Sequence, residues 1–330
     1  MAAGALPGRV RATIGFIIRR LFQAVLVLIG VMLITIVLFH LVSSYTLAKA
    51  IVGPRATPAQ IAQTIKQRGF NQPIWIQFWW QVYNYLHLNF GNSFHFNSPV
   101  KNLIQHDLPR TLALVGTSTV LALIVAVPLG VFQTVRRNKP SDYVLSSLAF
   151  IFYAMPPFVL GPLLILLLAV DIHVFAPTIN PSESVLTIMT SWKEFTLPVL
   201  TLAAVTVASF SRYMRSSMMD ALAEDYVRTA KAKGASRMRV LFRHAFRNAL
   251  IPIITLLGLS LPAIAGGAVI TETVFNYPGM GLLTYIAANS FDVNVVVATT
   301  VVATVLTVSG SLLADILYAV VDPRIRYARR

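Results

Sequence analysis

Long apolar runs separated by short polar segments dominate the sequence. Each run has on the order of 20 residues or more, enough for a helix to cross a bilayer. Lipid cannot satisfy backbone hydrogen bonds, and the runs are continuous, so helices are expected rather than a barrel. The pattern predicts an all-α integral membrane protein with six spans. The expected spans are 20–43, 110–135, 143–170, 196–218, 249–271 and 293–319.

Composition supports this assignment. Only 12% of the 330 residues are charged, and the mean hydropathy is +0.70. A soluble domain carries about 25% charged residues. The absence of cysteine excludes disulfides and thiolate metal sites.

Basic residues are distributed unevenly over the polar segments. Most Lys and Arg lie before the first span, between the second and third spans, within 211–250, and in the tail. The positive-inside rule therefore predicts a multi-pass membrane protein with both termini cytoplasmic. Ala48-Lys49-Ala50 fits a signal-peptide cleavage pattern, but the apolar run 21–42 exceeds the usual signal core of about 7–15 residues.

The expected organisation has four parts. Residues 1–43 form the cytoplasmic N-terminus and first span, and 44–109 form an external segment with amphipathic and aromatic helices. Residues 110–319 form a five-helix core that contains a cytoplasmic loop at 219–248, and 320–330 form a basic tail.

The external segment contains two helix patterns. "TPAQIAQTIKQRGF" predicts a helix that starts at Thr57 or Pro58 and ends at Gly69. "PIWIQFWWQVYNYLHLNF" is rich in Trp and Tyr, which favour the membrane–water interface. An interfacial helix is the first interpretation, and a platform that stacks carbohydrate or peptide is the alternative.

The loop 219–248 predicts two short helices joined at a glycine. Residues Ala221 to Lys233 favour a helix, and Gly234 is expected to form its C-terminal cap or a hinge. Ser236 is the expected N-cap of the next helix. Met238, Leu241, Phe242 and Ala245 have the spacing of one apolar face, while Arg239, Arg243 and Arg247 form a basic stripe. Such a hairpin either lies on lipid headgroups or docks into a protein. Its attachment to spans at both ends disfavours nucleic acid.

Several motifs carry a family resemblance. "RTAKAKG" (228–234) and "RHAFRNALIP" (243–252) resemble the coupling loop of ABC importer permeases, although Arg-Thr-Ala replaces Glu-Ala-Ala and His244 replaces the consensus Ile. "DLPRTLAL", "ETVFNYPGMGLLTYIAANSFD" and "DILYAVVDPRIR" resemble segments of the dipeptide/oligopeptide/nickel subfamily. The resemblance covers nearly the whole chain except 1–10 and 43–60.

This resemblance implies a six-helix, type I importer-like permease of the bacterial plasma (inner) membrane. It also implies no catalytic activity and no cofactor or metal in the chain itself. The implied partners are a homologous second permease, one or two ABC ATPase subunits that bind ATP and Mg, an extracytoplasmic substrate-binding protein, and membrane lipid, without nucleic acid. The expected ATPase-coupling residues are Tyr226, Arg228, Ala230, Ala232, Gly234, Ala235, Met238, Leu241, Phe242, Arg243 and His244.

Two further groups are candidate site residues. Prolines and glycines that interrupt spans predict kinks, or a pathway or hinge, because freed backbone groups must be satisfied by protein or a cavity. The candidate pathway or hinge residues are Pro156, Pro157, Gly161, Pro162, Pro262, Gly266 and Gly267. The candidate binding-protein contacts are Trp75, Trp79, Trp80, Tyr83, Pro278 and Gly279.

Other function classes have weaker support. There is no G-x-x-x-x-G-K-[ST] phosphate loop, so energy must come from a partner or an ion gradient. An ion-coupled secondary carrier should have midplane ionisable residues, and these are scarce. An intramembrane enzyme lacks a recognisable motif. Di- and oligopeptides are the expected substrates; nickel complexes, glutathione and other small solutes are alternatives within the subfamily.

Overall fold

The computed structural model describes residues 8–265 and 268–321. The chain divides into two compact units: 1–106 with 283–312, and 107–282 with 313–330. Helices α5 (Val100–Val135), α14 (Met280–Asn289) and α15 (Val293–Val321) each contribute residues to both units.

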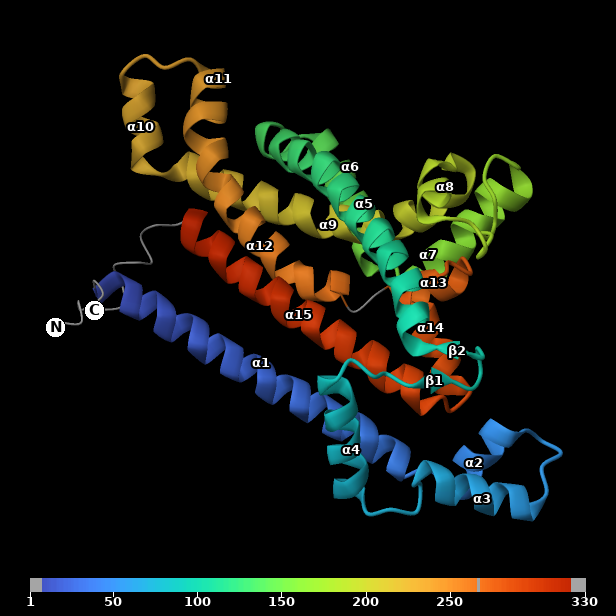
Figure 1. The fold of residues 1–330 in the computed structure, drawn as a ribbon. Helices are drawn as coiled ribbons and strands as arrows, with labels where there is room; N and C mark the ends of the chain where they lie inside the picture. The colour runs from blue at the N-terminus through green and yellow to red at the C-terminus, as the bar shows by residue number, and fades with distance from the viewer. Residues whose placement is uncertain (1–7, 266–267, 322–330) are drawn as a thin grey trace, which may run out of the picture. The chain divides into compact units, whose positions relative to one another are not determined.

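The first unit contains most of the predicted external segment (Figure 1). Its remaining elements are α1 (Gly8–His40), α2 (Ser44–Val52), α3 (Pro58–Arg68), α4 (Ile74–Leu86), and the antiparallel strands β1 (Asn92–Ser93) and β2 (Ser98–Pro99). Met32 and Ile36 of α1 pack against Phe78 of α4. These contacts anchor the aromatic helix to the first predicted span.

Helix α3 confirms the expected helix boundaries. Thr57 accepts a hydrogen bond from the Gln60 backbone, and the Gln60 side chain accepts one from the Thr57 backbone, which completes a capping box. The helix ends at Gly69, whose φ of 68° is left-handed. Both signals are local, so the sequence was sufficient to place the helix.

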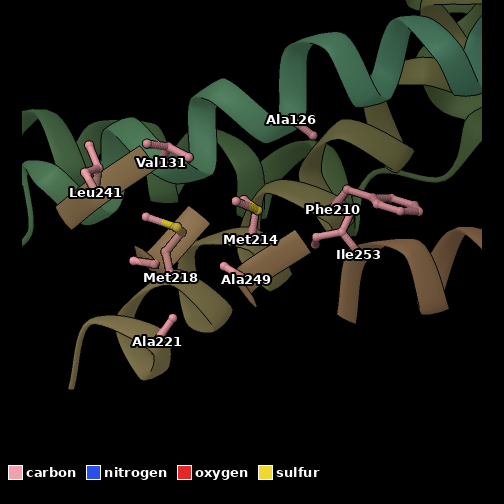
Figure 2. Close-up of a cluster of buried hydrophobic side chains, with 10 residues drawn as sticks. Ala126, Val131, Phe210, Met214, Met218, Ala221, Leu241, Ala249 and Ile253 are labelled. Carbon is pink, nitrogen blue, oxygen red and sulfur yellow. The ribbon is translucent and has the colours of Figure 1, made fainter. Parts of the chain in front are cut away.

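The second unit holds the remaining helices. They are α6 (Pro140–Ala154), α7 (Pro157–Leu164), the π-helix η1 (Ile165–Asp171), α8 (Val185–Thr190), α9 (Trp192–Ala223), α10 (Asp225–Ala232), α11 (Arg237–Arg239), the π-helix η2 (Val240–Phe246), α12 (Arg247–Ala265) and α13 (Val269–Val274). A core of buried side chains joins α5, α9, η2 and α12 (Figure 2). Met214 and Met218 of α9 are fully buried within it.

Five helices in the described ranges are long and apolar enough to span a membrane. They are Ile18–His40, Val100–Val135, Trp192–Ala223, Arg237–Gly258 and Val293–Leu313. They correspond to five of the six predicted spans. The third prediction, 143–170, corresponds to α6 followed by α7 and η1, which are bent by 106°. Within residues 8–265 and 268–321, a sixth candidate span therefore exists only if this bent pair counts as one crossing.

The bend coincides with Met155, Pro156 and Pro157. Met155 and Pro156 are extended, with ψ of 116° and 143°. A residue before proline is forced out of the helical region, so two consecutive prolines end α6 and start α7.

The fifth predicted span also differs from the structure. Helix α12 ends at Ala265, while α13 begins separately at Val269 after Ala268, whose φ and ψ are −98° and 60°. The predicted continuous helix to residue 271 therefore extends too far.

Candidate functional site

Helices α10 and α11 form a hairpin at one end of the second unit, beyond the ends of α9 and α12 (Figure 1). The expected first helix from Ala221 is interrupted, because α9 ends at Ala223 and Glu224 is extended with ψ of 151°. The chain turns there and α10 starts at Asp225. The interruption makes the hairpin a separate element rather than a continuation of the span.

The tip of the hairpin has the predicted caps. Gly234 has φ of +77°, and its N–H donates to Lys231 O at 2.9 Å while Ala235 N–H donates to Ala230 O at 3.1 Å. This pair of bonds is the Schellman arrangement, which favours glycine because a Cβ is disfavoured at positive φ. Ser236 then accepts a hydrogen bond from Arg239 N, as expected of an N-cap.

The side chains between the two arms of the hairpin are apolar, and most of them are small. Val227, Ala230 and Val240 are buried together, with Leu222 and Ala235 packed against them. Ala230 thus belongs to the contact between the two arms. Its side chain offers no exposed surface to a partner.

The predicted apolar face of the second arm is divided. Leu241 and Ala245 are buried in the core of the second unit, whereas Met238 and Phe242 are 62% and 50% exposed. Leu241 therefore does not fill a partner's groove from this conformation. The residues that the structure leaves exposed at the expected site are Tyr226, Arg228, Ala232, Gly234, Met238, Phe242 and Arg243; His244 and Ala235 are half-buried.

Positive charge surrounds the exposed apolar pair. Arg239, Arg243 and Arg247 are all exposed. Arg228 lies 3.6 Å from Asp225, but both side chains are largely exposed, so this pair adds little stability. The surface can therefore receive a partner that combines an apolar recess with acidic side chains.

The second arm continues into a predicted span. Helix α11, η2 and α12 follow one another without a break, and the junction residues Val240 and Arg247 are helical. A π-helical turn carries one residue more per turn than the α-helix and is frequent at functional sites. The second arm and this candidate span therefore form one continuous helical segment.

Close packing ties the hairpin's base to α5 and α9. Figure 2 shows Leu241 beside Val131 of α5, with Met218 of α9 nearby. At Gly130 an added Cβ would lie 2.6 Å from Met214 Cβ. The two helices can approach this closely only without that side chain.

An ion pair fastens α6 to α9 in the same region. Arg215 donates to Asp142 from Nε at 3.1 Å and from Nη2 at 2.8 Å. Asp142 also accepts from Asn138 N–H. The Asp142 side chain is only 3% exposed, and Arg215 28%. Sequence inspection singled out neither residue, because their separation along the chain hides the pairing.

A second buried polar cluster surrounds Glu272, which follows the fifth predicted span. Glu272 is fully buried, and its carboxylate accepts hydrogen bonds from Thr111 Oγ1 and Leu282 N, both at 2.9 Å. Thr111 in turn accepts from Met280 N at 2.8 Å. Tyr277 Oη donates to Arg110 O at 2.7 Å. These bonds fasten the Pro-Gly-Met-Gly loop to α5 and α13.

Burial raises the pKa of Glu272, while hydrogen bonds from Leu282 and Thr111 oppose the rise. Burial also raises the pKa of the Tyr277 hydroxyl, and the nearby Glu272 charge acts in the same direction. Neither residue was expected as a site residue, and only the resemblance of the segment 272–292 drew attention to it.

The candidate pathway residues are only partly described. Pro156, Pro157, Gly161 and Pro162 all lie at the bend or in α7. A Cβ at Gly161 would lie 3.0 Å from Val274 Cγ1, so the glycine permits contact between α7 and α13. Pro262 lies in α12, with its side chain outside the described set, and Gly266 and Gly267 lie outside the described residues.

The candidate binding-protein contacts fall into two groups. Trp75, Trp79, Trp80 and Tyr83 are 62–65% exposed on α4 in the first unit. Pro278 and Gly279 belong to the second unit and are buried, so their side of the loop is occupied by the chain itself.

Within 8–265 and 268–321, no group of three or more His, Asp or Glu side chains could hold a metal ion. The geometry thus defines a class of protein: a helical membrane protein with an exposed cationic hairpin continuous with a span.

Two family models match the chain. "Binding-protein-dependent transport system inner membrane component" covers residues 126–327, and the corresponding N-terminal model covers 13–115. The chain belongs to this family of inner-membrane transport permeases. The predicted resemblance to ABC importer permeases is confirmed, as is the multi-pass membrane assignment.

Two relatives are similar in sequence to this chain along almost its full length. The chain is 38% identical to the oligopeptide transport system permease protein AppB of Bacillus subtilis over 319 residues, covering 94% of this chain and 99% of the relative. It is 34% identical to the glutathione transport system permease protein GsiC of Escherichia coli K12, covering 95% and 99%.

A solved structure supports the fold. An inward-facing MetNI methionine ABC transporter chain matches with a TM-score of 0.55 at 16% identity, covering 68% of this chain and 98% of that one.

Proposed function

We propose that this chain is the translocation subunit of an ATP-driven importer of di- and oligopeptides. The observation that carries the proposal is the hairpin, because it exposes Met238 and Phe242 among arginines and is continuous with a predicted span. The 38% identity to an oligopeptide permease supports the substrate class.

In this proposal the chain forms the pathway with a homologous second permease. One or two ABC ATPase subunits bind ATP and Mg and dock on loop 219–248, while an extracytoplasmic binding protein delivers the peptide. The positive-inside distribution supports cytoplasmic termini and a cytoplasmic hairpin. Trp75, Trp79, Trp80 and Tyr83 of α4 remain the proposed contacts for the binding protein.

Coupling then works as rigid-body transmission. When the ATPases close, they displace the hairpin through Met238, Phe242 and the arginines. Helix α12 receives the displacement directly, and α9 receives it through the core around Met214 and Met218. The bend at Pro156–Pro157, Pro262 and the Gly266–Gly267 pair are the proposed hinge or pathway positions.

Glutathione import is the second candidate, because GsiC relatives are 34% identical over nearly the whole chain. The two substrates can be separated by reconstituting the full importer with its binding protein in proteoliposomes. Peptide import requires ATP-dependent uptake of a labelled tripeptide that excess glutathione does not reduce. Uptake of glutathione alone would favour the second candidate, and uptake driven by an ion gradient without ATP would contradict both.

The docking assignment has its own test. Phe242→Ser should reduce ATPase association and peptide uptake together, because it removes an exposed apolar contact. Leu86→Ser is the matched control, since Leu86 is 78% exposed on α4. Equal effects of the two substitutions would contradict docking at the hairpin.

The hairpin tip offers a second variant. A Cβ added at Gly234 would meet nothing within 4 Å, so we expect a larger side chain to project from the tip into the docking partner's space. We expect Gly234→Trp to remain in the membrane and to lose coupled transport. Normal ATPase association and uptake in this variant would count against the proposal.

A further inference from the structure

The first unit contains a cavity of about 760 Å³. It lies among the end of α1, helices α2, α3 and α4, the segment around β1, and the start of α15. Cavities of roughly 300–1,000 Å³ accommodate drug-sized ligands. All lining residues belong to the same compact unit.

Side-chain carboxamides are the main polar groups of the lining. Gln77, Gln81 and Asn84 lie on one face of α4 at helical spacing, and Asn92 and Asn294 contribute from other segments. Gln81 is only 8% exposed, and Asn294 Nδ2 donates to Asn92 O at 2.9 Å. A carboxamide has both N–H donors and a carbonyl acceptor, the same pair that a peptide group presents.

Charge in the cavity is asymmetric. Lys66 and Arg68 are exposed in the lining, and no carboxylate of the described residues lies within ion-pair distance of either. The one acidic lining residue, Asp292, is buried and accepts hydrogen bonds from Ser93 Oγ at 2.6 Å and His95 N at 3.3 Å. The α3 end of the cavity is therefore available to an anionic group.

Aromatic and aliphatic side chains complete the lining. Ile36 and Phe39 come from α1, Trp80 from α4, and Phe90 from the segment before β1. Such surfaces receive apolar side chains while the polar groups fix orientation. A neutral sugar or a lipid tail would leave Lys66 and Arg68 without an anionic partner.

We propose that this cavity is a peptide-binding site on the permease itself, separate from the binding protein. The carboxamides pair with the peptide's main chain, Lys66 and Arg68 receive its C-terminal carboxylate, and the aromatic groups contact its side chains. The inference rests on the proposed peptide-import function and adds a second place of contact with the transported molecule.

The test uses the complete permease–ATPase complex in nanodiscs of zwitterionic lipid, without the binding protein. Labelled tetra-alanine and its C-terminal amide are the probes. We expect saturable binding of tetra-alanine and weaker binding of the amide. No saturable binding, or a lipid found in the cavity in its place, would overturn the proposal.

Variants assign the binding to this cavity. Gln81→Leu should weaken binding roughly tenfold, because a peptide group loses its hydrogen-bonding partner on burial. The double variant Lys66→Gln/Arg68→Gln should bind acid and amide equally. Gln63→Leu removes an exposed carboxamide of α3 outside the cavity and should change nothing. Equal effects of Gln81→Leu and Gln63→Leu would overturn the assignment.

A photoreactive peptide keeps the test decisive if a variant fails to assemble. In the wild-type complex, cross-links to residues 66–94 support the proposal, and cross-links confined elsewhere overturn it. Uptake with the binding protein present separates the two hypotheses. Peptide import without binding by the complex alone removes this inference and leaves the proposed function, whereas absence of peptide import removes both.

Discussion

Glycines at the hairpin tip and in the Pro-Gly-Met-Gly loop serve opposite physical needs. Gly234 has a left-handed backbone and empty space where a side chain would be. Gly279 has no room at all, since an added Cβ would lie 2.6 Å from the Glu272 carboxyl carbon. Conformation requires the first glycine, and packing requires the second.

This difference separates a surface that receives a partner from a structure that holds the chain together. At the hairpin, polar and charged groups face outward and carry few internal bonds. Around Glu272, the side chains of Glu272, Thr111 and Tyr277 are buried, and each is hydrogen-bonded to another segment. Substitutions in the loop should therefore act on stability, while substitutions in the hairpin should act on coupling.

The strongest test of this contrast is Gly279→Ala. We expect a loss of roughly 3 kcal/mol or more, because a methyl group must displace a buried, hydrogen-bonded carboxylate. Thermal unfolding of the purified complex measures it. Gly116→Ala is the control, since its Cβ meets nothing within 4 Å in α5 and alanine favours a helix. A Gly279→Ala variant as stable as this control would contradict the packing argument.

Arg215→Met should have the next largest effect. It leaves the Asp142 carboxylate buried without its cation, a change that costs about 3–5 kcal/mol for a fully buried pair. We expect about 2–3 kcal/mol, because the Arg215 side chain is 28% exposed. Chemical denaturation measures it, and Arg137→Met, at an exposed arginine, should be nearly neutral. A double variant that also carries Asp142→Asn should recover part of the loss.

Glu272→Gln tests the buried loop through pH. Because burial raises the folded-state pKa of Glu272, the native protein keeps this proton to a higher pH than the unfolded chain does. Below the ordinary value of 4.5, both native and unfolded states are protonated. As pH rises above it, ionisation stabilises the unfolded wild-type chain, and stability falls until the native pKa is passed. The Tm of wild type relative to Glu272→Gln should therefore fall with rising pH. A difference independent of pH would contradict a raised pKa.

Gly234→Ala should have the smallest effect on stability. A non-glycine residue in the left-handed region costs about 1–2 kcal/mol, and no steric clash adds to it. Thermal unfolding should therefore change less than for Gly279→Ala, while ATP-dependent uptake should fall clearly only with a bulky side chain. A larger loss of stability at Gly234 than at Gly279 would reverse the comparison.

Local features of this fold could be predicted from the sequence. The capping box at Thr57, the left-handed Gly69 and the Ser236 cap depend on residues within a few positions of one another. The double proline that ends α6 is equally local. The apolar runs also predicted the positions of five helices that are long and apolar enough to span a membrane, because length and hydropathy alone define such helices.

Features that depend on tertiary contacts could not be predicted. Thr111 and Glu272 are far apart in sequence, and nothing near either residue indicates the other. In the hairpin, Leu241 and Phe242 are adjacent and similarly apolar, yet one is buried and the other exposed. A regular 3.6-residue period places both within one broad apolar face, but adjacent residues point about 100° apart, so tertiary packing decides which of the two is buried.

The π-helical turn η2 also has a consequence for the register of the whole second arm. A π-helical turn behaves as an α-helix with one surplus residue, and one residue corresponds to about 100° of helix rotation. Deleting a single residue within 240–246 would restore the i to i−4 hydrogen bonds of an α-helix. The deletion would also rotate Met238 around the helix axis, away from its present direction. The extra residue of η2 therefore fixes the direction in which α11 presents Met238 relative to α12.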